Sequence, residues 1–235
     1  MLSTFITFGG GGKNYIDAGN RLVGQAKSLE LFDNIVLYTD DYLKNDIEFW
    51  KQHHEFIEKN RRGYGYWIWK PYIVKKTLEM MKNNDILMYL DCGCEIDYRK
   101  KNIFKKNFKL VETVNLIGEP VLVENQYNKM DLVLHLDMLS DKYLKTPQLQ
   151  GCVWIMLVCD KTRNLVNTWY DLACNYHMID DTPSISKNLD CFIEHRHDQS
   201  VLSLLAKKYD LFNTEHTLHD CVEIIRNRTG ISRLK

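Results

Sequence analysis

Apolar and polar positions follow two rhythms along the first half of the chain, one typical of strands and the other of helices. Three segments are short and apolar, as expected of buried strands: Leu2–Phe8, Asn34–Thr39 and Ile86–Leu90. Between the first two, apolar residues recur at helical spacing, namely Ala18, Leu22, Ala26 and Leu29. The order strand, glycine-rich loop, helix, strand predicts a parallel pair of strands with a right-handed crossover.

The second half continues the alternation. Further apolar segments are Val114–Ile117, Leu132–Leu136 and Gly151–Val158. Helical patterns follow Pro71, Asp160 and Asp198, residue types that favour the first turn or the cap of a helix. Strands that alternate with helices predict a three-layer α/β/α sandwich around a mostly parallel sheet, and 235 residues suit one such domain, 1–235.

Polar or glycine residues follow three of the predicted strands directly. These strand ends are Gly9–Lys13, Thr39–Asp41 and Asp91–Glu95. Ligands of open α/β sheets collect at the carboxyl ends of the parallel strands. The pattern therefore predicts the place of a binding site before it indicates the chemistry there.

Charge and composition limit the kinds of partner that we expect for this protein. Lysine plus arginine and aspartate plus glutamate both total 31, so no large basic field for nucleic acid is expected. The seven cysteines are irregularly spaced, and the apolar start Met1–Phe8 lacks the features of a secretory signal. The apolar stretch Cys152–Cys159 is much shorter than the ~20 residues of a membrane span. We therefore expect a cytoplasmic protein with reduced thiols and no membrane span.

Four successive glycines, Gly9–Gly12, let the backbone approach a ligand closely and expose several N–H groups to an anion. Neither the P-loop nor the dinucleotide fingerprint is complete, because Asn14 stands where the first needs serine or threonine and the second lacks its third glycine. A phosphate-binding loop and a flexible turn both fit this segment.

The segment Arg61–Pro71 contains two tryptophans, two tyrosines, two glycines and three cations. Aromatic rings stack on bases or sugars, and Lys70 is a candidate to neutralise a diphosphate. The alternative is that Trp67 and Trp69 pack in the core while the arginines extend to solvent.

A carboxylate directly after a buried strand is costly unless it is paired or binds a metal, which makes Asp91 a candidate ligand for Mn²⁺ or Mg²⁺. His195 and His197 flank Arg196, and they are further candidates for metal and phosphate contacts. Asp198 is either an ordinary helix cap or a catalytic carboxylate.

Four segments in this order resemble nucleotide-sugar glycosyltransferases of the GT-A type: Phe5–Gly9, Arg62–Pro71, Tyr89–Glu95 and His195–Ser200. The second and fourth are similar to segments of small glycosyltransferase-like proteins of bacteria and large DNA viruses. The abundance of Lys, Asn, Ile and Asp is what an AT-rich genome gives, so a giant-virus origin, and there a collagen-type glucosyltransferase, fits the resemblance.

The resemblance implies roles for individual residues. The ends of the first two strands would hold the uridine through Thr7, Phe8, Gly9, Thr39 and Asp40, and Lys70 and Arg196 would face the diphosphate. Asp91 would take the first position of the metal-binding DxD motif, with Glu95, His195 or His197 completing the shell, because Gly93 replaces the second aspartate. Gln150 would lie near the anomeric carbon, on the face that retaining enzymes use, and Asp198 would activate or position the acceptor.

The predicted function is transfer of a hexose from a UDP-sugar, UDP-glucose or UDP-galactose, to a hydroxyl of a glycan or glycosylated protein, with Mn²⁺ assisting UDP departure. Residues 1–98 would bind the donor and 99–235 the acceptor. The aromatic segment and the basic C-terminal residues would also suit a homodimer. Two alternatives are an inactive sugar-nucleotide-binding module and a nucleotidyltransferase.

Overall fold

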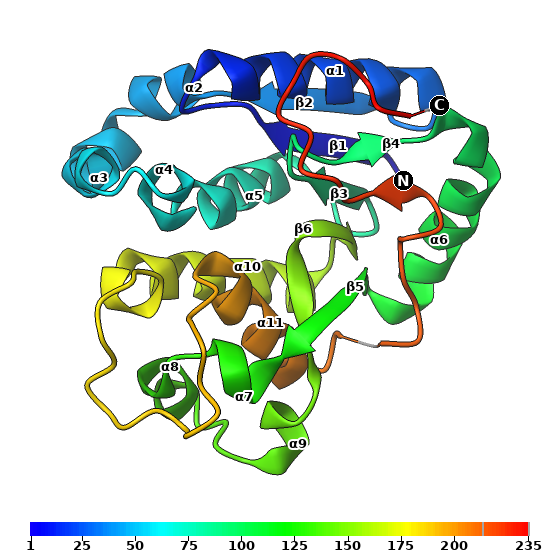
Figure 1. Cartoon of the computed structure of the whole chain (residues 1–235). Helices are drawn as coiled ribbons and strands as arrows, with labels where there is room; N and C mark the ends of the chain where they lie inside the picture. Colours follow the sequence, from blue (N-terminus) through cyan, green and yellow to red (C-terminus); the bar gives the residue numbers. More distant parts are fainter. Residues whose placement is uncertain (213, 235) are drawn as a thin grey trace.

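The computed structural model describes residues 1–212 and 214–234 and builds them around a five-stranded sheet (Figure 1). The strand order is β2 (Asn34–Tyr38), β1 (Ser3–Phe8), β3 (Ile86–Leu90), β6 (Pro147–Leu157) and β5 (Leu116–Val123). β1 pairs in parallel with β2 and β3, whereas β6 is antiparallel to both β3 and β5. The predicted α/β fold, with a mostly parallel central sheet and helices on both faces, is confirmed.

Side chains alternate between two cores along every central strand, since successive residues of a strand point to opposite faces. Phe5 and Met88 contact one core, where α1 (Lys13–Leu29) and α6 (Lys101–Val114) cover the sheet. Ile6 and Tyr89 contact the other core, which is covered by α5 (Trp69–Met80), α10 (Asp160–Cys174) and α11 (Asp198–Lys208). Strands buried on both faces explain why these segments read as continuous apolar runs.

The remaining elements lie around these layers. They are α2 (Asp40–Asn45), α3 (Ile47–Lys59), α4 (Gly63–Tyr66), η1 (Tyr98–Lys100), α7 (Glu124–Tyr127), α8 (Met130–His135), α9 (Asp141–Leu144) and η2 (Tyr176–Met178). A second sheet joins β4 (Glu95–Ile96) to β7 (Val222–Glu223), so the C-terminal segment packs beside the end of β3. Among the described residues, no helix has the length and apolar character needed to cross a membrane.

Several element boundaries differ from the sequence prediction. The apolar segment Leu132–Leu136 lies mainly in the helix α8, and Val114 ends α6 instead of opening a strand. The cap of α10 is Cys159, whose side chain accepts from the backbone at Thr162, so Asp160 is the first helical residue. Asp198 is likewise the first residue of α11, and the capping position belongs to His197.

Gly65 has a backbone φ of 82°, and a Cβ atom there would lie 2.7 Å from Cγ1 of Ile57. Replacing Gly65 with alanine therefore combines strain with overpacking, and we expect a loss of about 2 kcal/mol in the free energy of unfolding. The matched control is Gly24→Ala in α1, where a Cβ meets nothing within 4 Å and helix propensity favours alanine by about 1 kcal/mol. Urea denaturation of both variants measures the difference, and equal stabilities would contradict the strain.

Candidate active site at the carboxyl edge of the sheet

The carboxyl ends of the three parallel strands meet at one edge of the sheet, as predicted. The backbone N–H of Gly9, after β1, donates to the carbonyl of Tyr38 at the end of β2 (2.8 Å). The N–H of Asp91, after β3, donates to the carbonyl of Cys152 (2.9 Å). Because β6 runs antiparallel, its amino-terminal half, which includes Gln150, enters the same edge.

A buried lysine joins two carboxylates at this edge. Lys70, in the first turn of α5, is 2% exposed. Its Nζ lies 2.9 Å from Oδ2 of Asp198 and 3.3 Å from Oδ1 of Asp91, and it donates to the carbonyl of Gly151 (3.2 Å). Asp91 also accepts from the hydroxyl of Tyr89 (2.5 Å). Asp91 is the outer member of this cluster, because 34% of its side chain is exposed whereas Asp198 is almost fully buried.

The cluster changes the proton affinities of its members. Burial acts against the charge of Lys70, but the ion pairs with Asp198 and Asp91 outweigh it, and the pKa of Lys70 is raised. Burial raises the pKa of Asp198 to about 6, although the Lys70 ammonium opposes this shift. Lys70 is thus a permanent cation placed between two carboxylates.

The glycine-rich loop lies against aromatic rings. A Cβ atom at Gly10 would meet the ring of Phe8 at 2.5 Å, and one at Gly11 would meet the ring of Tyr64 at 3.1 Å. Phe8 in turn stacks on Trp69, with 3.8 Å between ring centroids. The glycines therefore let the backbone pass close to two aromatic side chains, and Tyr64 covers the loop that was predicted to hold the donor.

Other residues predicted to hold the uridine are less available. The hydroxyl of Thr7 is buried and donates to the carbonyl of Leu90 (2.7 Å), so it links two strands. Thr39 caps α2 at the end of β2, and Asp40 pairs with Lys44 (3.0 Å) on the surface. Thr7 therefore lies inside the sheet, and Thr39 and Asp40 lie at the border of the edge.

The short element α4 is left-handed. Gly63, Tyr64, Gly65, Tyr66 and Trp67 all have positive φ values, between 49° and 82°. Left-handed conformations cost non-glycine residues about 1–2 kcal/mol each and rarely occur in succession. Strain of this kind clusters at binding sites and catalytic centres. The turn directs Tyr64 toward the glycine-rich loop and Trp67 toward His197.

Glu95 lies close in sequence to Asp91 but serves another partner. Its buried carboxylate accepts from Asn227 (2.6 Å), Gln25 (2.9 Å), the Arg233 backbone (2.9 Å) and the Ser232 hydroxyl. Burial pushes its pKa up, but these hydrogen bonds outweigh that effect and lower the pKa to about 2. The side chain thus fastens the C-terminal segment to α1 instead of sharing a site with Asp91.

The two histidines, His195 and His197, differ in how many of their ring nitrogens form hydrogen bonds. Nδ1 of His195 accepts from the Lys129 backbone (3.2 Å), and its Nε2 donates to the carbonyl of Met178 (2.8 Å). Nδ1 of His197 donates to the carbonyl of Ile179 (2.7 Å), while its Nε2 has no hydrogen-bond partner. His195 is fully satisfied by backbone groups, and His197 keeps one free nitrogen.

Arg196 and Gln150, also predicted from the sequence, lie at the margin. Arg196 donates to the carboxylate of Glu194 (2.6 Å), so its charge is already paired. Gln150 is half-buried on β6, next to Gly151, whose carbonyl contacts Lys70.

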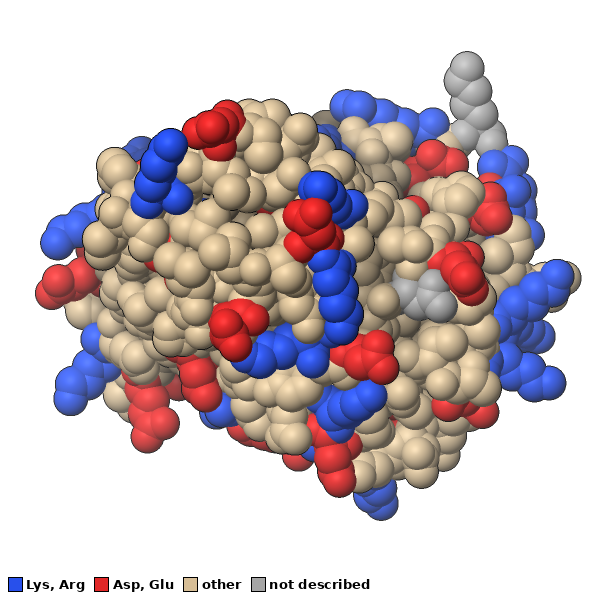
Figure 2. Space-filling model, turned by 90° about the horizontal axis from the view of Figure 1, so that it is seen from below, with Lys and Arg blue, Asp and Glu red and all other residues tan. Residues whose placement is uncertain are grey.

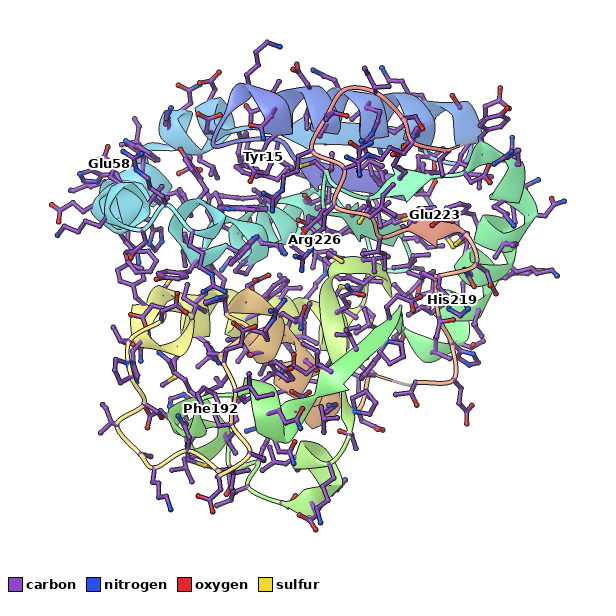
Figure 3. The ribbon with its side chains drawn as sticks, in the orientation of Figure 1. Tyr15, Glu58, Phe192, His219, Glu223 and Arg226 are labelled. Atoms are coloured by element: carbon purple, nitrogen blue, oxygen red, sulfur yellow. The ribbon has the colours of Figure 1, made fainter. Side chains whose placement is uncertain are left out.

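Two arginines at this edge were recognised in the sequence only as part of a basic C-terminal run. Arg228 lies over the ring of Tyr15 (5.4 Å) near the glycine-rich loop. Arg226 packs its backbone against Gly93 (Tyr15 and Arg226 are labelled in Figure 3). Both are exposed, and among the described residues neither has a carboxylate partner within ion-pair distance. A Cβ atom at Gly93 would lie 3.2 Å from Cα of Arg226, which explains why position 93 holds a glycine.

A metal site built from protein side chains does not fit this arrangement. Glu95 and His195 are engaged elsewhere, the free nitrogen of His197 lies beside Asp181 instead of Asp91, and Lys70 fills the place between Asp91 and Asp198 where a cation would sit. Within residues 1–212 and 214–234, no group of three His, Cys, Asp or Glu side chains is placed to hold a metal ion.

No protein-family model matches the chain, and no curated protein matches it in sequence. One of the solved structures that match is that of mouse xyloside xylosyltransferase 1 in its apo form. The two share 11% sequence identity with a TM-score of 0.47, over 90% of this chain and 84% of that chain.

Proposed function

We propose that the chain is a glycosyltransferase that takes a sugar from a nucleotide-diphosphate donor. The observation that carries this proposal is the carboxylate–lysine–carboxylate cluster next to a glycine-rich loop, at the edge where parallel strands end. A site for a nucleotide sugar needs a loop whose backbone can approach the nucleotide closely, and polar side chains near the sugar. Both are present at this edge, with Tyr64 beside the loop to stack on the base.

In this proposal, residues 1–98 supply most of the donor site, and 99–235 bind the acceptor and also contribute Gln150, Arg226 and Arg228 to the donor side. The exposed guanidinium groups of Arg226 and Arg228 meet the charge of the departing nucleoside diphosphate. Asp91 contacts the transferred sugar, and Gln150 lines the same side of it. Asp198, predicted as catalytic, is buried behind Lys70 and acts as a positioning residue that keeps the ammonium in place.

Lys70 takes the electrostatic role that a divalent ion plays in many nucleotide-sugar enzymes. The Lys70 ammonium neutralises one of the two carboxylates and occupies the space between them. We therefore expect turnover in the presence of EDTA. The donors to test first are UDP-glucose and UDP-galactose, and the acceptor class is a hydroxyl of a glycan or glycosylated protein, in the cytoplasm.

Asp91→Asn is expected to lower hydrolysis of the UDP-hexose donor by about 100-fold, because the outer carboxylate of the cluster is removed while its shape is kept. UDP release is measured for UDP-glucose and UDP-galactose, with Mn²⁺ and with EDTA. Asp171→Asn, an exposed residue of α10, is the matched control and should behave like the wild type.

The outcomes separate the alternatives. Full activity of Asp91→Asn would remove Asp91 from the reaction, and a strict need for Mn²⁺ would contradict the role of Lys70. Donor binding in a thermal-shift assay without any turnover identifies an inactive binding module. Preference for UTP or CTP with release of pyrophosphate identifies a nucleotidyltransferase.

A further inference from the structure

His197 combines three unusual features next to the proposed catalytic cluster. Its side chain is 3% exposed, its backbone has φ 58° and ψ −128°, and its Nε2 is buried without a hydrogen-bond partner. A strained backbone and an unsatisfied buried atom both destabilise a fold unless a ligand uses them. The preceding histidine, His195, has neither property, although it lies only two residues away.

The tautomer of His197 follows from its contacts. Nδ1 lies 2.7 Å from the carbonyl of Ile179, and a carbonyl can only accept, so Nδ1 carries the proton. Burial lowers the pKa of His197 to about 4, which keeps the ring neutral. Nε2 therefore presents a lone pair and can only accept a hydrogen bond.

A second acceptor faces this lone pair. Oδ1 of Asp181 lies 3.7 Å from Nε2 of His197, beyond hydrogen-bond distance. Two acceptors cannot satisfy each other, so a group that serves both must bring donors. Neighbouring hydroxyls of a sugar offer two donors at comparable spacing.

The charges around this pair favour a neutral ligand. Arg62 lies 3.1 Å from Asp181 and 3.7 Å from Glu194, and Arg196 lies 2.6 Å from Glu194. Each cation is thus balanced by a carboxylate, unlike Arg226 and Arg228 at the donor side. A phosphate or carboxylate ligand would find no free cation here, whereas a polyol needs none.

Space and aromatic surface lie beside Asp181. The segment 175–197 extends from the end of α10 past α8 and returns to α11 (Figure 1), and it borders a hollow of about 560 Å³. Residues lining this hollow include Asp181, Thr182, Ser184, Ser186, Phe192, Glu194 and His195 (Phe192 is labelled in Figure 3), and Asp181 connects the hollow to His197. Its volume is in the usual range for small-molecule sites. The rings of Tyr66 and Trp67 pack on the ring of His197, and their centroids lie 5.0 and 5.3 Å from its centroid.

We propose that His197 and Asp181 bind the acceptor of the reaction, a neutral sugar whose neighbouring hydroxyls donate to Nε2 of His197 and to the Asp181 carboxylate. This inference rests on the proposed function, since His197 directly precedes Asp198 and so joins the subsite to the cluster. The left-handed turn supplies the aromatic wall of the subsite, and the hollow receives the rest of the sugar chain.

The test measures binding without donor, so it does not depend on turnover. The wild-type chain is titrated with methyl glycosides of glucose, galactose, mannose and xylose, using saturation-transfer NMR. His197→Asn keeps a donor for the Ile179 carbonyl but removes the Nε2 lone pair, and it should weaken glycoside binding at least about tenfold. Asp181→Asn, on a half-exposed side chain, should do the same.

His54→Asn is the matched control, because Nδ1 of His54 also contacts a backbone carbonyl, that of Trp50 (2.9 Å), and His54 does not line the hollow. It should bind glycosides like the wild type. The subsite would be overturned if the wild type bound no glycoside. It would also be overturned if His197→Asn and Asp181→Asn bound glycosides as tightly as the wild type. Glycoside binding with no donor hydrolysis would instead overturn the proposed function and leave the subsite standing.

Discussion

Replacing Lys70 with methionine is expected to lower the free energy of unfolding by about 3 kcal/mol and to abolish donor turnover. Methionine fills a similar volume but leaves Asp198 buried without its counter-ion. Removing one partner of a buried ion pair usually costs about 3–5 kcal/mol, and the partly exposed Asp91 lowers that figure here. Chemical denaturation and the UDP-release assay measure the two effects.

Lys76→Met is the matched control on the same helix. Lys76 is partly exposed, and its nearest carboxylates, on Asp46 and Glu79, both lie 3.9 Å away. Surface pairs of this kind contribute at most about 1 kcal/mol. If Lys70→Met proves as stable as Lys76→Met, the Lys70 ammonium does not stabilise the buried carboxylate of Asp198.

The place of the site could be predicted from the sequence because it depends on local patterns. A buried apolar strand that ends in a carboxylate fixes Asp91 at the sheet edge, and the glycine run after β1 points to the same edge. The mostly parallel sheet followed from the alternation of strands and helices.

The partners of each residue could not be predicted in this way, since they depend on tertiary packing. Nothing in the segment around Lys70 shows that its ammonium lies between Asp91 and Asp198, residues 21 and 128 positions later. The antiparallel direction of β6, which brings Gln150 to the edge, is also invisible in its apolar pattern.

The C-terminal segment was the least predictable part of the candidate site, and it explains why position 93 holds a glycine. Its charge suggested only a basic run, yet it packs Arg226 against Gly93 and places Arg228 over Tyr15. An acid at position 93 would meet this backbone. On the face of the molecule seen in Figure 2, acidic and basic side chains are intermixed and form no large basic field.

Glu95 is the residue that holds this segment, and Glu95→Gln is expected to lower the free energy of unfolding at pH 7 by about 2 kcal/mol. The carboxylate accepts from Asn227, the Arg233 backbone and Ser232, and Arg21 lies 3.7 Å away. An amide cannot accept all of these bonds, and its NH₂ group would face donors. Residues 225–234 should then become more sensitive to protease.

The pH dependence of stability distinguishes the charge of Glu95 from its shape. The pKa of Glu95 is lowered from 4.5 to about 2 in the folded chain, so the unfolded chain binds the proton more readily. The stabilisation is therefore complete above about pH 5 and is lost as pH falls toward 2. Urea denaturation from pH 7 to pH 2 should show a smaller fall for Glu95→Gln than for the wild type, whereas Glu112→Gln, an exposed acid of α6, should follow the wild type. Parallel curves for Glu95→Gln and the wild type would mean that the carboxylate is not what anchors the C-terminal arginines at the carboxyl edge of the sheet.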